Sequence, residues 1–325
     1  SSKHPRGARN LGFAMRFTAR VSGARGLLGS ASLFAAACVA QQRALGVWPL
    51  HRMGPRRPLL VGIGCASALN VRTAVAAVAT SEESHMRLPR STVTELSRLH
   101  TAFGGDASVH DNRPMPQAAP SGGTISALSV QIPALERLAP YLARPGAEVL
   151  DLGFGSGVMI AMMLALAGPG ATVVGVDFAD KVPIARKNLL SAKSGAPYLP
   201  FREDQFELLA SDVFEHIEEW EKEGQLFDVV YAGCSMDPYT DQLRRFLGRM
   251  KPNGAAVFNL GNAGRQGMYF VANGGRVCEQ LMRVNFMMCE SALTPRTLSE
   301  EVPLREAALG RWICSNVFGV AEQDL

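Results

Sequence analysis

The chain has 325 residues, of which 47% are hydrophobic and 19% are charged, so it can fold around a buried core rather than remain disordered. The net charge is +4, but residues 1–81 hold eleven Lys or Arg and no acid, which leaves 22 basic and 29 acidic residues in the rest. That acidic remainder argues against nucleic-acid binding by the core. The six cysteines lack Cys-x-x-Cys spacing, which argues against a zinc site and favours free thiols.

Residues 1–84 have the composition of a targeting leader, rich in Arg, Ala and Ser, with Met15 as a candidate start. Basic clusters precede two apolar runs, residues 27–40 and 59–79, as in a bipartite plastid presequence; a long mitochondrial presequence is the alternative. A membrane anchor is a third interpretation. Asn70 and Arg72 near the middle of the second run argue against a stable span. We therefore expect the leader to be disordered or removed.

Residues 85–117 are predicted to form an N-terminal helical and loop segment. Helical spacing over residues 91–100 predicts a helix with a capping box from Ser91 or Thr92 to Glu95. His100 and His110 stand alone in the sequence, and both are expected at the surface.

A glycine-rich turn over residues 120–127 opens the predicted main domain, residues 118–293, and leads into a helix from about residue 130 to 142. Thr124 and Ser126 place hydroxyls at the start of that helix. Such hydroxyls can bind a carboxylate, or they can simply cap the helix. The residues alone favour the cap.

The centre of the predicted domain is the turn Asp151-x-Gly153-x-Gly155-Ser156-Gly157, which follows the apolar residues Val149, Leu150 and Leu152. This pattern predicts a buried parallel strand, a glycine turn and a helix over residues 158–166. A second apolar run over residues 171–176 ends in Asp177. In a doubly wound sheet, that carboxylate can accept hydrogen bonds from a ribose.

Strand and helix patterns continue to alternate up to residue 261. Helices are predicted over residues 181–190, 215–223 and 237–250, and strands over residues 206–212, 227–233 and 255–260. Lys181, Arg186 and Lys187 are expected to point outward, the 215–223 helix to be a solvated charged face, and residues 251–254 to close the last helix. The alternation predicts an α/β fold with a doubly wound, mostly parallel sheet and helices on both faces. Residues 294–325 remain unassigned.

The acids around the glycine turn discriminate between nucleotide ligands. A dinucleotide fingerprint reads Gly-x-Gly-x-x-Gly, whereas here the third glycine comes one residue early. Asp151 would repel a pyrophosphate but would suit a ligand that carries an ammonium and a sulfonium. The pattern therefore favours S-adenosylmethionine.

The chain resembles the protein-L-isoaspartate O-methyltransferase family over about residues 110–290. The matching motifs are Gly123-Thr-Ile-Ser-Ala127, residues 148–157, 174–177, 211–212, 227–233, 250–254 and 259–261. The Thr-Ile-Ser motif is the specific one, since the others are shared by many methyltransferases. The chain departs from the family at Gly122, where Gln is usual, and at Leu128 and Ser129, where Pro and His are usual.

This resemblance implies a Rossmann-like methyltransferase that methylates the carboxylate of L-isoaspartyl or D-aspartyl residues in damaged proteins, a protein repair reaction. Ser126 and Thr124 would orient the substrate carboxylate. The cofactor residues would be Asp151, Gly153, Gly155 and Gly157 for the methionine part, Asp177 for the ribose and Asp212 for the adenine amine. Ser156 and Gly233 would also belong to the cofactor site.

Two other functions stay open from the sequence. One is methylation of another carboxylate substrate, and the other is a non-catalytic methyltransferase-like subunit of an organellar complex. No metal and no nucleic-acid partner are expected, and the chain is expected to be a monomer. Without a genuine leader it would be cytoplasmic, as is usual for the family.

Overall fold

The computed structural model describes residues 87–105, 114–117, 119, 121–193, 195–196, 198–237, 241–261, 266–287 and 318. All of them belong to one compact unit, Pro58–Leu325. The predicted leader, His110 and almost all of residues 294–325 lie outside the described residues. Organelle targeting therefore stays a prediction.

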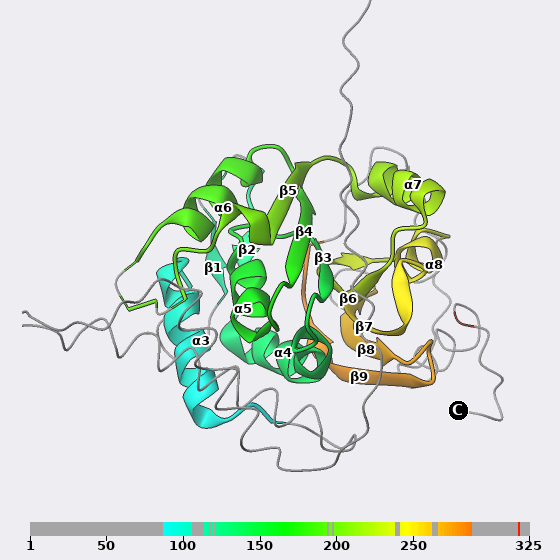
Figure 1. Cartoon of the computed structure of the whole chain (residues 1–325), viewed down its shortest axis with the longest axis horizontal. Helices are drawn as coiled ribbons and strands as arrows, with labels where there is room; N and C mark the ends of the chain where they lie inside the picture. Colours follow the sequence, from blue (N-terminus) through cyan, green and yellow to red (C-terminus); the bar gives the residue numbers. More distant parts are fainter. Residues whose placement is uncertain are drawn as a thin grey trace, which may run out of the picture. The chain divides into compact units, whose positions relative to one another are not determined.

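A seven-stranded sheet forms the centre of this unit (Figure 1). Its strands are β3 (Glu148–Leu152), β4 (Thr172–Asp177), β5 (Phe206–Ala210), β6 (Phe227–Met236), β7 (Met250–Leu260), β8 (Gln266–Ala272) and β9 (Val277–Val284). They lie in the order β5-β4-β3-β6-β7-β8-β9. The first five strands in this order are parallel, β8 is antiparallel to β7, and β9 is antiparallel to β8. The predicted doubly wound, mostly parallel sheet is confirmed, and its order reverses between β3 and β6.

Helices cover both faces of the sheet (Figure 1). They are α3 (Arg90–Ala102), α4 (Leu128–Leu142), α5 (Val158–Leu166), α6 (Lys181–Leu190), α7 (Val213–Glu223) and α8 (Asp241–Leu247). Residues of α3 to α6 share one hydrophobic cluster, and residues of α7 and α8 share a second. Among the described helices, none combines the length and apolarity needed to cross a membrane.

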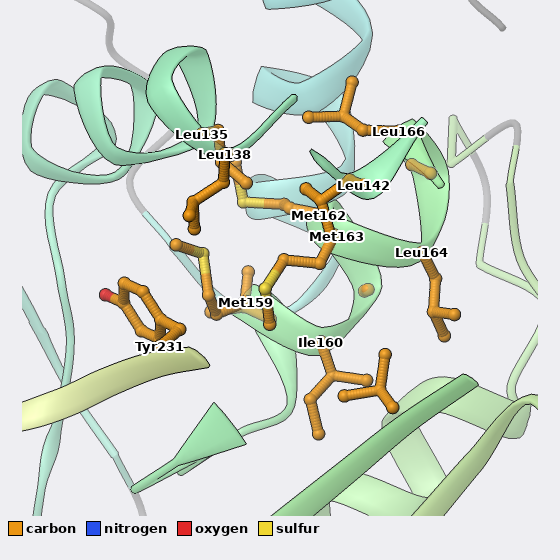
Figure 2. Packing of buried hydrophobic residues seen from close by; sticks show 14 of the residues in the cluster. Leu135, Leu138, Leu142, Met159, Ile160, Met162, Met163, Leu164, Leu166 and Tyr231 are labelled. Atoms are coloured by element: carbon orange, nitrogen blue, oxygen red, sulfur yellow. The ribbon is translucent and has the colours of Figure 1, made fainter. Parts of the chain in front are cut away.

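Helix α5 is the best-buried element of the first cluster. Every residue from Val158 to Leu166 is buried, because the helix lies between the sheet and α3 and α4. Figure 2 shows its Met159, Met162 and Met163 packed toward the leucines of α4. A helix that is apolar all round is stable only in such a position. Its burial fixes the glycine turn at its start.

The predicted helix over residues 237–250 is present as α8, but its predicted end at residue 250 and its closure at residues 251–254 are wrong. Helix α8 is shorter, and Lys251 to Gly254 lie inside β7. The cause is tertiary, because the Lys251 ammonium lies 3.0 Å from Glu148 and 2.8 Å from Asp228 on neighbouring strands. An irregularity in the β6–β7 register accommodates the Pro-Asn segment.

Helix α3 differs from its prediction in two respects. Its N-cap is Pro89, with no side-chain cap, so the predicted capping box is wrong. His100 is 1% exposed rather than at the surface, because α3 packs on α5 and α4. Helix α7 likewise buries Phe214 and Ile217, so it is an amphipathic helix and not only a solvated face.

Two antiparallel pairings were not predicted from the sequence. Strands β8 and β9 form a hairpin whose turn contains Asn273 and Gly274, both with positive φ; Asn-Gly is a hairpin signal. A two-stranded ribbon pairs β1 (Met115–Pro116) with β2 (Thr124–Ile125) just before α4. This ribbon carries the predicted substrate motif.

Candidate functional site

A pocket of about 1390 Å³ lies at the carboxyl ends of the parallel strands. Its floor is formed where β3, β4, β5 and β6 end, which is the switch point at which doubly wound sheets bind ligands. The β1–β2 ribbon, the start of α4 and the residues after β9 also line it. The predicted site residues in this lining are Thr124, Ser126, Gly153, Gly155, Asp177, Asp212 and Gly233.

Close backbone approach shapes the pocket floor. A Cβ at Gly233 would lie 2.8 Å from the carbonyl oxygen of Gly153, so the two strand ends touch there. Gly155 has a φ of 55°, and its N–H donates to the Asp177 carboxylate at 2.6 Å. The turn therefore presents backbone rather than side chains to a ligand.

Two of the predicted cofactor residues face the protein interior instead. Gly157 is the N-cap of α5, and a Cβ there would lie 3.2 Å from the Cβ of Ala185 in α6. Ser156 is 3% exposed, and its carbonyl accepts a hydrogen bond from the Asn188 side chain at 3.0 Å. Neither lines the pocket; both anchor the glycine turn to α6.

Asp151 is fully buried below the glycine turn and does not line the pocket. Neither of its carboxylate oxygens has a hydrogen-bond partner among the described residues. Burial, and then the charge of Asp177, raise the pKa of the Asp151 carboxyl well above its ordinary value. Its cross-strand neighbour Tyr231, labelled in Figure 2, has a pKa raised by burial and by Asp151.

This unpartnered acid tests the fit of a ligand. Burial already disfavours the negative charge of the Asp151 carboxylate, and a phosphate nearby would add a second negative charge. A cation would instead compensate the charge of Asp151. The residues present therefore fit the ammonium and sulfonium of S-adenosylmethionine better than a dinucleotide.

Asp177 and Asp212 stand at the ends of adjacent strands, and both line the pocket. Asp177 accepts the N–H groups of Gly155 and Phe178; burial raises its pKa, and these two hydrogen bonds oppose the shift. The Asp212 carboxylate caps α7 by accepting the Phe214 N–H at 2.9 Å. Both acids are held by backbone donors.

Thr124 and Ser126 also line the pocket. Helix α4 begins at Leu128 with Ala127 as N-cap and no side-chain cap, so the interpretation of Ser126 as a plain cap is wrong. The Ser126 carbonyl lies 3.0 Å from Nε2 of the buried His100. The serine is thus held through its backbone.

Several residues of the lining were not predicted as site residues. Gln117, Lys181 and Cys234 belong to it, as do Arg283 to Met287 after β9. Lys181, expected to point outward, is 3% exposed. A lysine at the start of a helix opposes the helix dipole, and that was the signal in the sequence.

A model of a methyltransferase domain family matches residues 129–288, from the start of α4 to beyond β9. None of the curated proteins matches the chain in sequence.

Among solved structures, the chain is similar to a Plasmodium falciparum protein assigned as a protein-L-isoaspartate O-methyltransferase, in complex with S-adenosyl-L-homocysteine. The two are 20% identical with a TM-score of 0.47, over 69% of this chain and 98% of that one. A second protein-L-isoaspartate O-methyltransferase is 15% identical with a TM-score of 0.45, over 69% of this chain and 66% of that one. An O-methyltransferase of Bacillus cereus is 16% identical with a TM-score of 0.30, over 58% and 72%. These values are too low to carry a functional assignment.

Residues 129–288 match a methyltransferase domain model, and the doubly wound sheet with its acid-flanked glycine turn has the Rossmann-like architecture. They also support S-adenosylmethionine as the cofactor.

Proposed function

We propose that the protein methylates the carboxylate of L-isoaspartyl or D-aspartyl residues in damaged proteins, a protein repair reaction. The observation that carries this proposal is the position of Thr124 and Ser126. They line the same pocket as Gly153, Gly155 and Asp177. The predicted substrate motif therefore faces the same cavity as these three predicted cofactor residues.

S-adenosylmethionine supplies a methyl group on a sulfonium, which leaves as a neutral thioether. A substrate carboxylate oxygen attacks the methyl carbon, the carbon–sulfur bond breaks and a methyl ester forms. The nucleophile is already ionised at neutral pH, so no base is needed to activate it. What the protein must supply is alignment of oxygen, methyl and sulfur.

The residues divide this alignment between them. Asp177 would hold the ribose hydroxyls and Asp212 the adenine amine, while the glycine turn lets the backbone approach the methionine part. Thr124 and Ser126 would orient the substrate carboxylate with their hydroxyls. Such positioning can contribute up to roughly 7 to 11 kcal/mol to lowering a barrier.

The test is methyl transfer from labelled cofactor to an isoaspartyl peptide, with the matched aspartyl peptide as control. We expect the isoaspartyl peptide alone to be methylated. Transfer to other carboxylates only would identify a related methyltransferase, and absence of cofactor binding in calorimetry would favour a non-catalytic subunit.

The variant Ser126→Ala tests the substrate half of the site. Losing a hydrogen bond to a charged group costs about 1.5 to 3 kcal/mol, so turnover should fall roughly ten- to a hundredfold. The cofactor dissociation constant should stay unchanged. Unchanged turnover per folded molecule would contradict the proposed role of Ser126.

A further inference from the structure

Lys181 is a buried cation in an unfavourable place. It is the first residue of α6 and only 3% exposed, although lysines are rarely buried without partners and a cation at a helix start opposes the helix dipole. Its ammonium donates to the carbonyl oxygen of Gly122 and, at 3.2 Å, to Oε1 of Gln117. The contacts that hold this charge therefore come from the segment that precedes Thr124.

The neighbouring residue Asp180 also contacts this segment. Its carboxylate accepts the backbone N–H of Ser121 at 2.8 Å. A Cβ at Gly123 would lie 2.9 Å from the Lys181 ammonium, and Gly123 has a φ of 109°. The start of α6 thus contacts Ser121, Gly122 and Gly123, which directly precede Thr124.

Gln117 extends these contacts to the glycine turn. Its backbone N–H donates to the Gly123 carbonyl at 3.0 Å, directly beside the β1–β2 ribbon. Its side-chain nitrogen lies 2.4 Å from where a Cβ of Gly155 would stand. The Gln117 side chain therefore contacts both the glycine turn and Lys181, the residue that holds the segment before Thr124.

We propose that Asp180 and Lys181 are positioning residues that fix the Thr124–Ser126 segment over the pocket and, through Gln117, couple its position to the glycine turn. They act through the ribbon and not on the reacting atoms. The expected effect of these residues on substrate turnover rests on the proposed carboxyl methylation. Their effect on the position of the Thr124–Ser126 segment does not depend on it.

The test compares Lys181→Met with Lys187→Met, which removes an exposed charge from the same helix. Met keeps the length of the side chain but cannot donate to Gly122 or Gln117. In Lys181→Met we expect kcat/KM for the isoaspartyl peptide to fall at least about tenfold, because alignment depends on these hydrogen bonds. The cofactor dissociation constant should change less than about threefold, and Lys187→Met should behave as the wild type.

Asp180 offers a second matched pair. Asp180→Asn keeps an oxygen that can accept the Ser121 N–H, whereas Asp180→Ala does not. Loss of activity in the alanine variant, with recovery in the asparagine variant, is the expected pattern. Equal activity in both would overturn the role of Asp180.

Hydrogen exchange separates failure of this proposal from failure of the proposed function. Amides of residues 121–126 should exchange faster in Lys181→Met than in Lys187→Met, with the sheet unchanged, and cofactor should slow their exchange in the wild type. Unchanged exchange in Lys181→Met would overturn the proposal, even if isoaspartyl turnover is confirmed. Faster exchange without any isoaspartyl turnover in the wild type would support the positioning role and reject only the substrate.

Discussion

Replacing Asp151 by Asn should separate the charge of this buried acid from its shape. Asn is nearly isosteric with Asp but does not ionise. In the free protein both carboxylate oxygens lack a partner among the described residues, and burial holds the pKa of the group well above its ordinary value. The acid is therefore unfavourable to the free fold and, if it pairs with the cofactor ammonium, favourable to the complex.

The sign of the stability effect follows from this raised pKa. Below the ordinary pKa of an aspartate, Asp151 is protonated in both the folded and unfolded states and has no effect. As pH rises from there toward the folded-state pKa, only the unfolded state ionises, so the wild type loses stability. Asp151→Asn should lack this loss, and its advantage in free energy of unfolding should grow with pH across that window.

Cofactor affinity should change in the opposite direction. A charge-assisted hydrogen bond contributes about 1.5 to 3 kcal/mol, so Asp151→Asn should weaken binding roughly ten- to 150-fold. The wild type should also release a proton on binding wherever Asp151 is protonated in the free protein, and its affinity should rise with pH through the folded-state pKa.

Calorimetry in two buffers of different ionisation enthalpy measures both the affinity and the proton release. Denaturant unfolding at several pH values measures the stability. If Asp151→Asn binds S-adenosylmethionine as tightly as the wild type and releases as many protons, Asp151 does not pair with the cofactor.

Two further predictions concern the pocket floor and the leader. Gly233→Ala should lower the cofactor affinity, and it should lower the free energy of unfolding by about 1 to 3 kcal/mol, because its Cβ would meet the Gly153 carbonyl oxygen at 2.8 Å. Thermal unfolding and calorimetry measure the two effects. An unchanged melting temperature would show that the strand ends can separate freely. A fusion of residues 15–84 to a fluorescent protein should reach an organelle, as the absence of acids up to residue 81 suggests. A diffuse cytosolic signal would argue against targeting.

The sequence by itself determined the elements around the glycine turn. The predicted helices over residues 158–166 and 181–190 agree with α5 and α6. Their boundaries are set locally, by glycines and by apolar residues whose spacing belongs to one kind of element. The strand-end positions of Asp177 and Asp212 in the pocket follow from the same alternation, because parallel strands end at one edge of a sheet.

Only the tertiary structure decided which polar groups are buried and what they contact. Lys251 lies in a strand because Glu148 and Asp228 pair with it, and Lys181 is buried because Gly122 and Gln117 accept its hydrogen bonds. These partners come from distant parts of the chain. A charged side chain looks the same in sequence whether water or the protein solvates it, and burial is tolerated only where the fold supplies the missing hydrogen bonds.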